Sequence, residues 1–121
     1  MSSWEKLEVE RIEHEDPEAV VYRLSGVLTD RKDCFDFLDT LRQDVRRGGS
    51  CLIINLEKCE HVTSAGVGIL AASYTSVTNA GGRMCLVGAS NRVLTLLKLV
   101  GLLSVMNHYT LELEAFNGMK D

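Results

Sequence analysis

Carboxylates are missing from a long part of this chain. No Asp or Glu occurs between His61 and Leu111, although the 121 residues include 17 acidic side chains against 13 Lys and Arg. The formal net charge of −4 argues against a protein that binds nucleic acid regardless of its sequence, because such binding needs many cations to neutralise phosphates. We therefore expect no nucleic-acid partner.

Long apolar runs are missing as well. No segment approaches the roughly 18 uninterrupted apolar residues that a membrane-spanning helix requires. The first residues, MSSWEKLEVE, are acidic, whereas a secretory leader begins with a basic stretch followed by an apolar one. These absences predict a cytoplasmic protein without direct membrane insertion.

Ligand-like spacing of cysteine and histidine is also absent. No C-x-x-C pair occurs among the four cysteines, which are Cys34, Cys51, Cys59 and Cys85. The three histidines, His14, His61 and His108, lie far apart in the sequence. Cys51 and Cys85 fall inside apolar, strand-like runs, which favours buried free thiols in a reducing compartment over metal ligands. We expect no metal site and no cofactor.

The first half of the chain alternates strand and helix signals. A chain of this length suits a single domain, which we expect over residues 1–121 with a core from about 7 to 116 and short polar ends. Strands are predicted at 7–12 and 20–26, around the single Pro17. Asp30 is the expected N-cap of a helix that ends at the sequence RRGG. Its apolar positions follow the helical period, at Cys34, Leu38, Leu41 and Val45.

The second half continues this alternation. Strands are predicted at 51–56, 83–88 and 103–109, helices at 65–79 and from Ser90 to Gly101, and a last helical turn or two at 110–116. The expected buried stripes are Val67, Leu70, Ala71, Tyr74 and Val77 on the first helix, and Val93, Leu96, Leu97 and Val100 on the second. Together these segments predict an α/β fold, with a mixed, mostly parallel sheet of four to five strands covered by three to four helices.

The segment CEHVTSAGVGILAAS, from Cys59 to Ser73, carries the candidate chemistry. Gly66, Gly68 and Ala71 fit the dinucleotide-binding pattern G-x-G-x-x-A. In such a site, however, the glycines follow the strand directly and an acid about 20 residues later holds the ribose. Here residues 57–65 are expected to form an intervening loop, and the region where that acid would stand, near Val87 to Ser90, has none. The glycines are better explained as small residues that let the helix pack closely.

Two further roles fit Thr63 and Ser64. A nucleophilic Ser64 needs a positioned base. His61 precedes it and is a candidate base, and the nearby acids Glu57 and Glu60 are expected in the preceding loop. The sequence TSAG, however, does not match the G-x-S-x-G turn of such nucleophiles. Alternatively, one of the two hydroxyls caps the helix. Capping does not explain why the first turn lacks acids. That absence leaves the positive end of the helix dipole open to an anion, which a phosphoryl group on Ser64 would supply with about −1.5 to −2 charges.

The sequence resembles the STAS domain family, the sulfate transporter and anti-sigma factor antagonist domains, from roughly Leu7 to Phe116. The central match is LIINLEKCEHVTSAGVGIL, which is similar to the family's apolar strand, loop and D-S-[ST]-G-[LV]-G-[VI]-L segment. LSGVL, AGGRMCLVGAS and VGLLSVM match in the same order. Within this family, the chain looks most like the free-standing bacterial antagonists.

This resemblance implies a STAS-like fold and a regulator of transcription that is not an enzyme. Members of this kind bind an anti-sigma factor that is also a serine kinase, are switched off when it phosphorylates them, and are restored by a metal-dependent phosphatase. The position match makes Ser64 the phosphorylated residue, with Thr63 as second choice. The expected partner-binding residues are Thr63, Ser64, Ala65, Gly66, Val67 and Leu94.

Departures from the family pattern keep other functions open. Thr63 stands where the family usually has Asp, and Ala65 where it has a hydroxyl. The alternative is a STAS scaffold that is never phosphorylated, or the cytoplasmic STAS subunit of a lipid or solute transporter. A module that binds a small ligand or nucleotide at the helix start is a third possibility. Leu94 and Leu99 fall off the expected buried stripe, so an apolar patch there would serve a partner or a homodimer.

Overall fold

The chain folds around a five-stranded sheet. The computed structural model describes residues 6–119 of the chain. The predicted polar ends lie partly outside this range, at residues 1–5 and 120–121. The elements are β1 (Leu7–Glu15), β2 (Glu18–Leu28), α1 (Lys32–Arg46), β3 (Cys51–Val62), α2 (Ser64–Asn79), β4 (Arg83–Val87), α3 (Asn91–Leu99), the 3-10 turn η2 (Leu102–Ser104), β5 (Asn107–Tyr109) and α4 (Glu112–Gly118).

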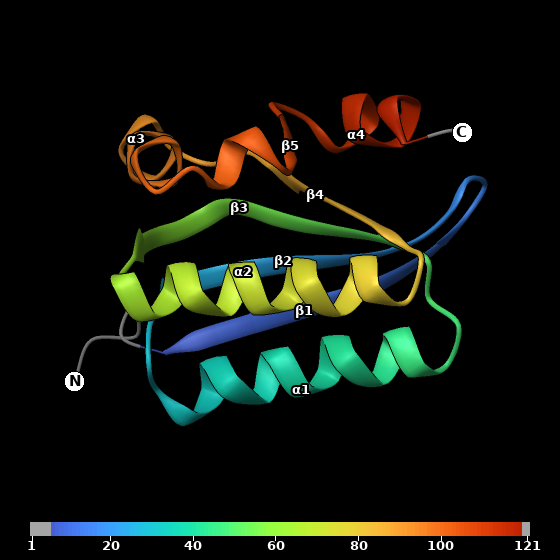
Figure 1. Cartoon of the computed structure of the whole chain (residues 1–121), viewed down its shortest axis with the longest axis horizontal. Helices are drawn as coiled ribbons and strands as arrows, with labels where there is room; N and C mark the ends of the chain where they lie inside the picture. Colours follow the sequence, from blue (N-terminus) through green and yellow to red (C-terminus); the bar gives the residue numbers. More distant parts are fainter. Residues whose placement is uncertain (1–5, 120–121) are drawn as a thin grey trace.

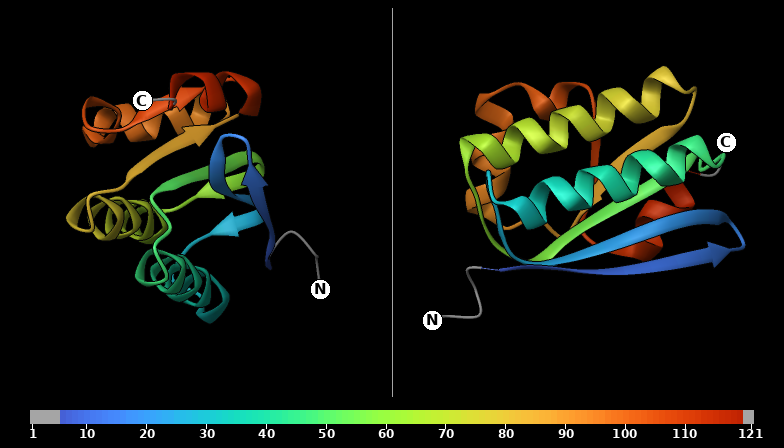
Figure 2. Two further views of the ribbon diagram at one scale, coloured as in Figure 1. Left: turned by 90° about the vertical axis from the view of Figure 1, so that its right-hand side faces the viewer. Right: turned by 90° about the horizontal axis from the view of Figure 1, so that it is seen from below.

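The strand order is β1-β2-β3-β4-β5. β1 and β2 form an antiparallel hairpin, and each of the later neighbours pairs in parallel. Helices α1 and α2 lie side by side on one face of the sheet, while α4 covers part of the other face (Figures 1 and 2). The predicted α/β class and the mixed, mostly parallel sheet are confirmed.

Alternate residues of the central strands fill two cores. Leu52, Ile54 and Leu56 of β3 face the larger core, beneath α1 and α2. Ile53 faces the smaller core, which Ala115 of α4 closes. A strand with helices on both faces reads as a continuous apolar run because neither side of it meets water, as predicted for residues 51–56.

Two expected boundaries in the first half are wrong. β3 continues to Val62, so Glu57 and Glu60 lie on a strand and not in a loop. The register between β2 and β3 shifts in this stretch, and such an irregularity breaks the alternation by which a strand is recognised. Asp30 does not cap α1, because the N-cap position is Arg31 and has no side-chain hydrogen bond to the helix.

In the second half of the chain, the structure differs from the sequence-based prediction in three places. Only Asn107–Tyr109 of the expected last strand pairs with the sheet, since Gly101 turns the chain at φ 82° into η2. Val100 is 52% exposed and so does not belong to the buried stripe. The buried face of α2 is Gly66, Ile69, Leu70, Ser73 and Val77, a stripe rotated from the expected one. Its small members Gly66 and Ser73 are invisible to a pattern based on large apolar side chains.

The cysteines are free thiols, as predicted, and only Cys51 is partly exposed. Burial raises the pKa of Cys59 to about 11 and that of Cys85 to about 12, so neither is a thiolate at neutral pH. Within residues 6–119, no cluster of His, Cys, Asp or Glu is arranged to hold a metal ion. No helix in that range is long and apolar enough to cross a membrane.

Candidate functional site at the start of helix α2

Three helices begin at one edge of the sheet. The parallel strands β2, β3 and β4 end there, and each is followed by a helix, α1, α2 and α3 respectively (Figure 1). In open α/β folds, this carboxyl edge of the strands is where binding residues gather. Thr63 and Ser64 stand at this edge, directly after β3.

Thr63 is the residue that caps α2. Its backbone is extended at φ −84° and ψ 176°, and its hydroxyl accepts a hydrogen bond from the amide of Gly66 at 3.2 Å. Its own amide donates to the carbonyl of Leu28 at 3.0 Å, which ties the start of α2 to the end of β2. Of the two adjacent hydroxyls, Thr63 therefore satisfies the open amides of the helix.

Ser64 occupies the first position of α2 and is exposed. Among residues 6–119, no hydrogen bond engages its hydroxyl. The first turn carries no acidic side chain, and the amides of Ser64 and Ala65 are the two that remain of the four at the helix start. A helix start of this kind favours an anion. The accessible hydroxyl and the favourable field coincide at Ser64.

Alanine substitutions distinguish the roles of the Thr63 and Ser64 hydroxyls. We expect Thr63→Ala to lower the free energy of unfolding by about 1 kcal/mol, because the amide of Gly66 loses its acceptor. Ser64→Ala is expected to change it by less than about 0.5 kcal/mol. Urea denaturation measures both. Ser90→Ala is the matched control, since Ser90 caps α3 through the amide of Val93 and should cost about as much as Thr63→Ala. Equal costs for Thr63→Ala and Ser64→Ala would contradict this assignment.

The two motif glycines differ in their surroundings. A Cβ placed on Gly66 would lie 2.1 Å from the carbonyl oxygen of Leu28, whereas one placed on Gly68 would meet nothing within 4 Å. Gly66 is buried and Gly68 is exposed. The interpretation of these glycines as close-packing residues is therefore right for Gly66 and wrong for Gly68.

The remaining sequence-predicted residues are distributed over two helices. Ala65 is exposed and Val67 half-buried in the first turn of α2, next to Ser64. Leu94 is half-buried on α3, and this helix lies at the same end of the molecule as the start of α2 (Figure 1). Residues 63–67 are thus consecutive at the start of α2, while Leu94 comes from α3.

Thr29 belongs to the site and was not predicted. Its hydroxyl accepts a hydrogen bond from that of Thr63 at 3.1 Å and donates to the Asp30 carboxylate at 3.3 Å. The chain therefore places a carboxylate two hydrogen bonds away from the cap of α2. Thr29 and Thr63 are 34 residues apart, so no local pattern could have linked them.

A family model of the STAS domain matches residues 8–115, which is most of the chain. The chain belongs to the STAS domain family. No curated protein is similar enough to this STAS domain to be matched to it.

Solved structures share the fold of this STAS domain at low sequence identity. An anti-sigma factor antagonist from Mycobacterium paratuberculosis is 21% identical, with a TM-score of 0.84 and all of both chains covered. RsbS of Moorella thermoacetica, solved as a serine-to-glutamate variant, is 19% identical with a TM-score of 0.80, covering 93% of this chain and 94% of that one. The Bacillus cell fate determinant SpoIIAA in its phosphorylated form is 22% identical with a TM-score of 0.71, covering 95% and 100%.

Proposed function

We propose that this STAS domain is an anti-sigma factor antagonist that binds a serine-kinase anti-sigma factor and is switched off by phosphorylation of Ser64. The observation that carries the proposal is that the two hydroxyls at the start of α2 have different roles. Thr63 caps the helix, while the Ser64 hydroxyl beside it is exposed and free of intramolecular hydrogen bonds in the described chain. The protein itself supplies no catalysis in this scheme and acts through its surface.

The physics of the switch is local. A phosphoryl group adds about −1.5 to −2 charges at neutral pH, and the amides and dipole of a helix start stabilise such a charge. The protein therefore tolerates the modification without refolding. A partner that had packed against a neutral hydroxyl would instead meet a dianion, close to the Asp30 carboxylate that Thr29 links to Thr63. Repulsion and desolvation of that charge would release the partner.

The structure favours Ser64 over Thr63 as the modified residue. The Thr63 hydroxyl both accepts from Gly66 and lies within hydrogen-bonding distance of Thr29, so a phosphate on Thr63 would cost the helix its cap. A phosphate on Ser64 breaks no intramolecular hydrogen bond in the described chain. The proposed kinase acts in the cytoplasm with ATP, and a metal-dependent serine phosphatase reverses the reaction.

Two of the similar structures support this proposal because each carries an added negative charge. SpoIIAA has been solved in a phosphorylated form, and RsbS with a serine replaced by glutamate. Proteins with this fold therefore accommodate a phosphate or an introduced carboxylate. We transfer this property to the position where our chain exposes a serine at an acid-free helix start.

Substitutions at Ser64 test the proposal. In cells of the source organism, Ser64→Ala should retain the partner and resist inactivation, because it keeps a neutral surface that no kinase can charge. Ser64→Asp should reduce the amount of co-purified partner by about tenfold, which corresponds to the loss of roughly 1.4 kcal/mol of binding free energy. Gly68→Ala, at an exposed position one turn on, controls for changes to the helix surface. Equal partner binding by the wild type and both Ser64 variants would exclude the switch.

The residue at position 63 favours a second candidate function. Family members usually carry an acid before the serine, whereas this chain has Thr63, whose hydroxyl caps the helix. In that case this STAS domain acts without phosphate, as a scaffold or as the cytoplasmic subunit of a transporter. One similar fold does come from a sulfate transporter family protein of Wolinella succinogenes. A protein that stays unmodified at Ser64 under every growth condition would support this second function.

A further inference from the structure

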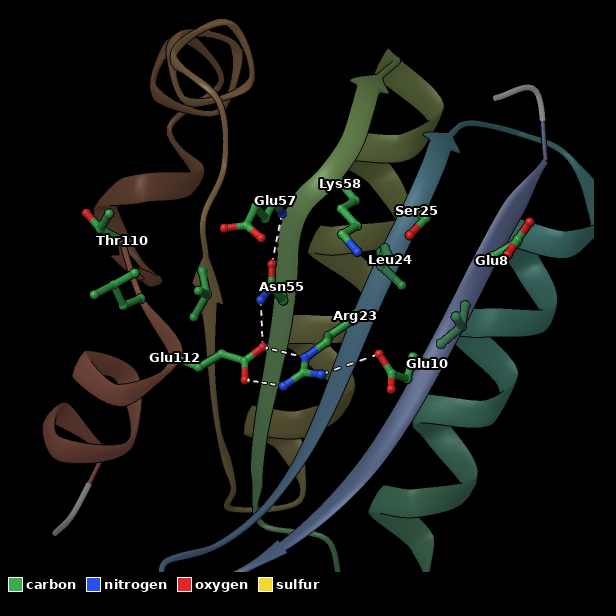
Figure 3. A pocket seen from close by; sticks show the side chains of 13 residues that line it. Glu8, Glu10, Arg23, Leu24, Ser25, Asn55, Glu57, Lys58, Thr110 and Glu112 are labelled. Atoms are coloured by element: carbon green, nitrogen blue, oxygen red, sulfur yellow. Dashed lines mark hydrogen bonds and ion pairs between the residues drawn. The ribbon is translucent and has the colours of Figure 1, made fainter. Parts of the chain in front are cut away.

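A half-open cavity of about 500 Å³ lies on the face of the sheet opposite α1 and α2 (Figure 3). Its walls come from β1, β2, β3, the end of β4 and the segment from Thr110 to Glu112, and it shares no residue with the start of α2. The volume falls in the range of small-molecule sites. Nothing in the proposed function uses this cavity.

A β-bulge in β3 shapes the cavity. Arg23 of β2 pairs with Asn55, but Ser25 pairs with Lys58, so two residues of β3 stand opposite one of β2. The Asn55 side-chain oxygen accepts a hydrogen bond from the amide of Glu57 at 2.8 Å and thereby supports the irregular backbone. Bulges of this kind re-aim side chains and are frequent beside binding sites.

The bulge turns two consecutive charged residues to the same side. In a regular strand, neighbours point to opposite faces. Here Leu56 and Cys59 both belong to the core under α1 and α2, whereas Glu57 and Lys58 between them both line the cavity. An acidic and a basic side chain thus enter one cavity from adjacent positions.

The polar side chains at the floor of the cavity already form hydrogen bonds and ion pairs with one another. Arg23 holds Glu112 through two contacts of 2.9 Å, and the Asn55 amide donates to the same carboxylate at 2.6 Å. The hydrogen bond from Arg23 keeps the pKa of Glu112 below its usual value, so the pair stays ionised at neutral pH. This floor is a rigid support and not the group that a ligand would neutralise.

Glu57 and Lys58 remain available for a ligand. Neither side chain takes part in an ion pair within residues 6–119, and both are exposed. Figure 3 shows the Lys58 ammonium directed towards the middle of the sheet and the Glu57 carboxylate towards the wall formed by Thr110. The two charges therefore face different parts of the same cavity.

The mixed charges restrict the ligand class. Four glutamates line the cavity, at positions 8, 10, 57 and 112, and oppose a polyanion such as a nucleoside phosphate. Lys58, which forms no ion pair within residues 6–119, opposes a polycation. The apolar side chains of Val87 and Leu111 add a hydrophobic part to the lining.

We propose that this cavity binds a small zwitterion, a molecule that joins an ammonium and a carboxylate to a short apolar body. Lys58 binds the carboxylate, Glu57 binds the ammonium, and the apolar body lies against the hydrophobic part of the lining. This site is independent of phosphorylation at Ser64.

Three probes that share the isobutyl group of leucine test the ligand class by NMR titration of the isotope-labelled protein. L-Leucine carries both charges, 4-methylpentanoate lacks the ammonium, and 3-methylbutylamine lacks the carboxylate. We expect L-leucine to shift the resonances of the cavity residues saturably, with a Kd about tenfold lower than that of either single-charge probe. The proposal is overturned if L-leucine produces no saturable shift, or if one single-charge probe binds as tightly.

Variants then locate the site. Lys58→Met and Glu57→Gln keep the side-chain length and remove one charge each, and each should raise the Kd for L-leucine by about tenfold. Lys32→Met is the matched control, because Lys32 is an exposed lysine on α1 that pairs with Asp36 away from the cavity. An unchanged Kd in both cavity variants, with amide spectra that show them folded, would place the zwitterion elsewhere and overturn the proposal.

Discussion

Replacing Gly66 by alanine is expected to lower the free energy of unfolding by about 3 kcal/mol, as forcing atoms into a closely packed region does. The added Cβ would lie 2.1 Å from the Leu28 carbonyl oxygen and 3.0 Å from a Val62 methyl group. The carbonyl cannot move away freely, because it also accepts the hydrogen bond from the Thr63 amide that joins β2 to the start of α2. Urea denaturation measures the loss.

Gly68→Ala is the matched control, two positions along the same helix. Its Cβ meets nothing within 4 Å, and alanine is favoured over glycine inside a helix by about 1 kcal/mol. We therefore expect a neutral or slightly stabilising effect. If the two alanine variants lost similar stability, the close contact with Leu28 could not be the cause of the loss at Gly66, and this part of the account would be wrong.

Asp44→Ala is expected to cost about 3 kcal/mol, the second large effect. The Asp44 side chain is only 6% exposed and accepts two hydrogen bonds from Arg11, at 2.9 and 2.7 Å, and one from the buried hydroxyl of Tyr22. This cluster ties α1 to both strands of the β1–β2 hairpin. Removing the carboxylate leaves the buried Tyr22 hydroxyl without its acceptor and leaves Arg11 with only the longer, exposed ion pair to Glu13 at 3.6 Å.

Asp36→Ala on the same helix is the control for Asp44. Asp36 forms an exposed pair with Lys32 at 3.0 Å, and its side chain is 57% exposed. Exposed pairs of this kind contribute about 0.3–0.5 kcal/mol, because water screens them. A loss at Asp36 as large as that at Asp44 would show that helix α1 responds to any missing acid, irrespective of the buried cluster.

The contribution of Asp44 should also depend on pH. Burial alone would raise the pKa of this carboxyl, but the hydrogen bonds from Arg11 and Tyr22 outweigh burial and leave the pKa below its usual value. A lowered pKa in the folded state means that the stabilisation is complete above the unfolded pKa of about 3.9 and is lost as pH falls through the folded pKa. The gap in stability between wild type and Asp44→Ala should therefore narrow in strong acid. A constant gap from neutral to acid pH would contradict this assignment.

The fold could be predicted largely from local patterns. The apolar run at 51–56, the cap at Ser90 and the glycines after α1, α2 and α3 all mark elements that the structure contains. The errors arose where a long-range contact overrides the local pattern. The charged residues after Leu56 read as a loop, yet they continue β3 because Asn55 supports a bulge there.

The candidate site was predictable in its position but not in its internal roles. The sequence places two hydroxyls before an acid-free helix, and only the structure shows that Thr63 caps it while Ser64 stays exposed. The demand for glycine at Gly66 comes from the Leu28 carbonyl, and the link from Thr63 to Asp30 passes through Thr29. Leu28 is the last residue of β2 and Thr29 follows it, and both lie more than 30 residues earlier in the chain. Such contacts leave no local signal in the sequence.

The central claim is that Ser64 carries a reversible phosphate. The most direct test is the intact mass of the protein purified from its own cells, with and without phosphatase treatment, followed by fragment mapping of the modified residue. We predict a phosphatase-sensitive gain of one phosphate, located on Ser64. A protein that remains unmodified under several stresses, or one that carries its phosphate on Thr63, would contradict the account.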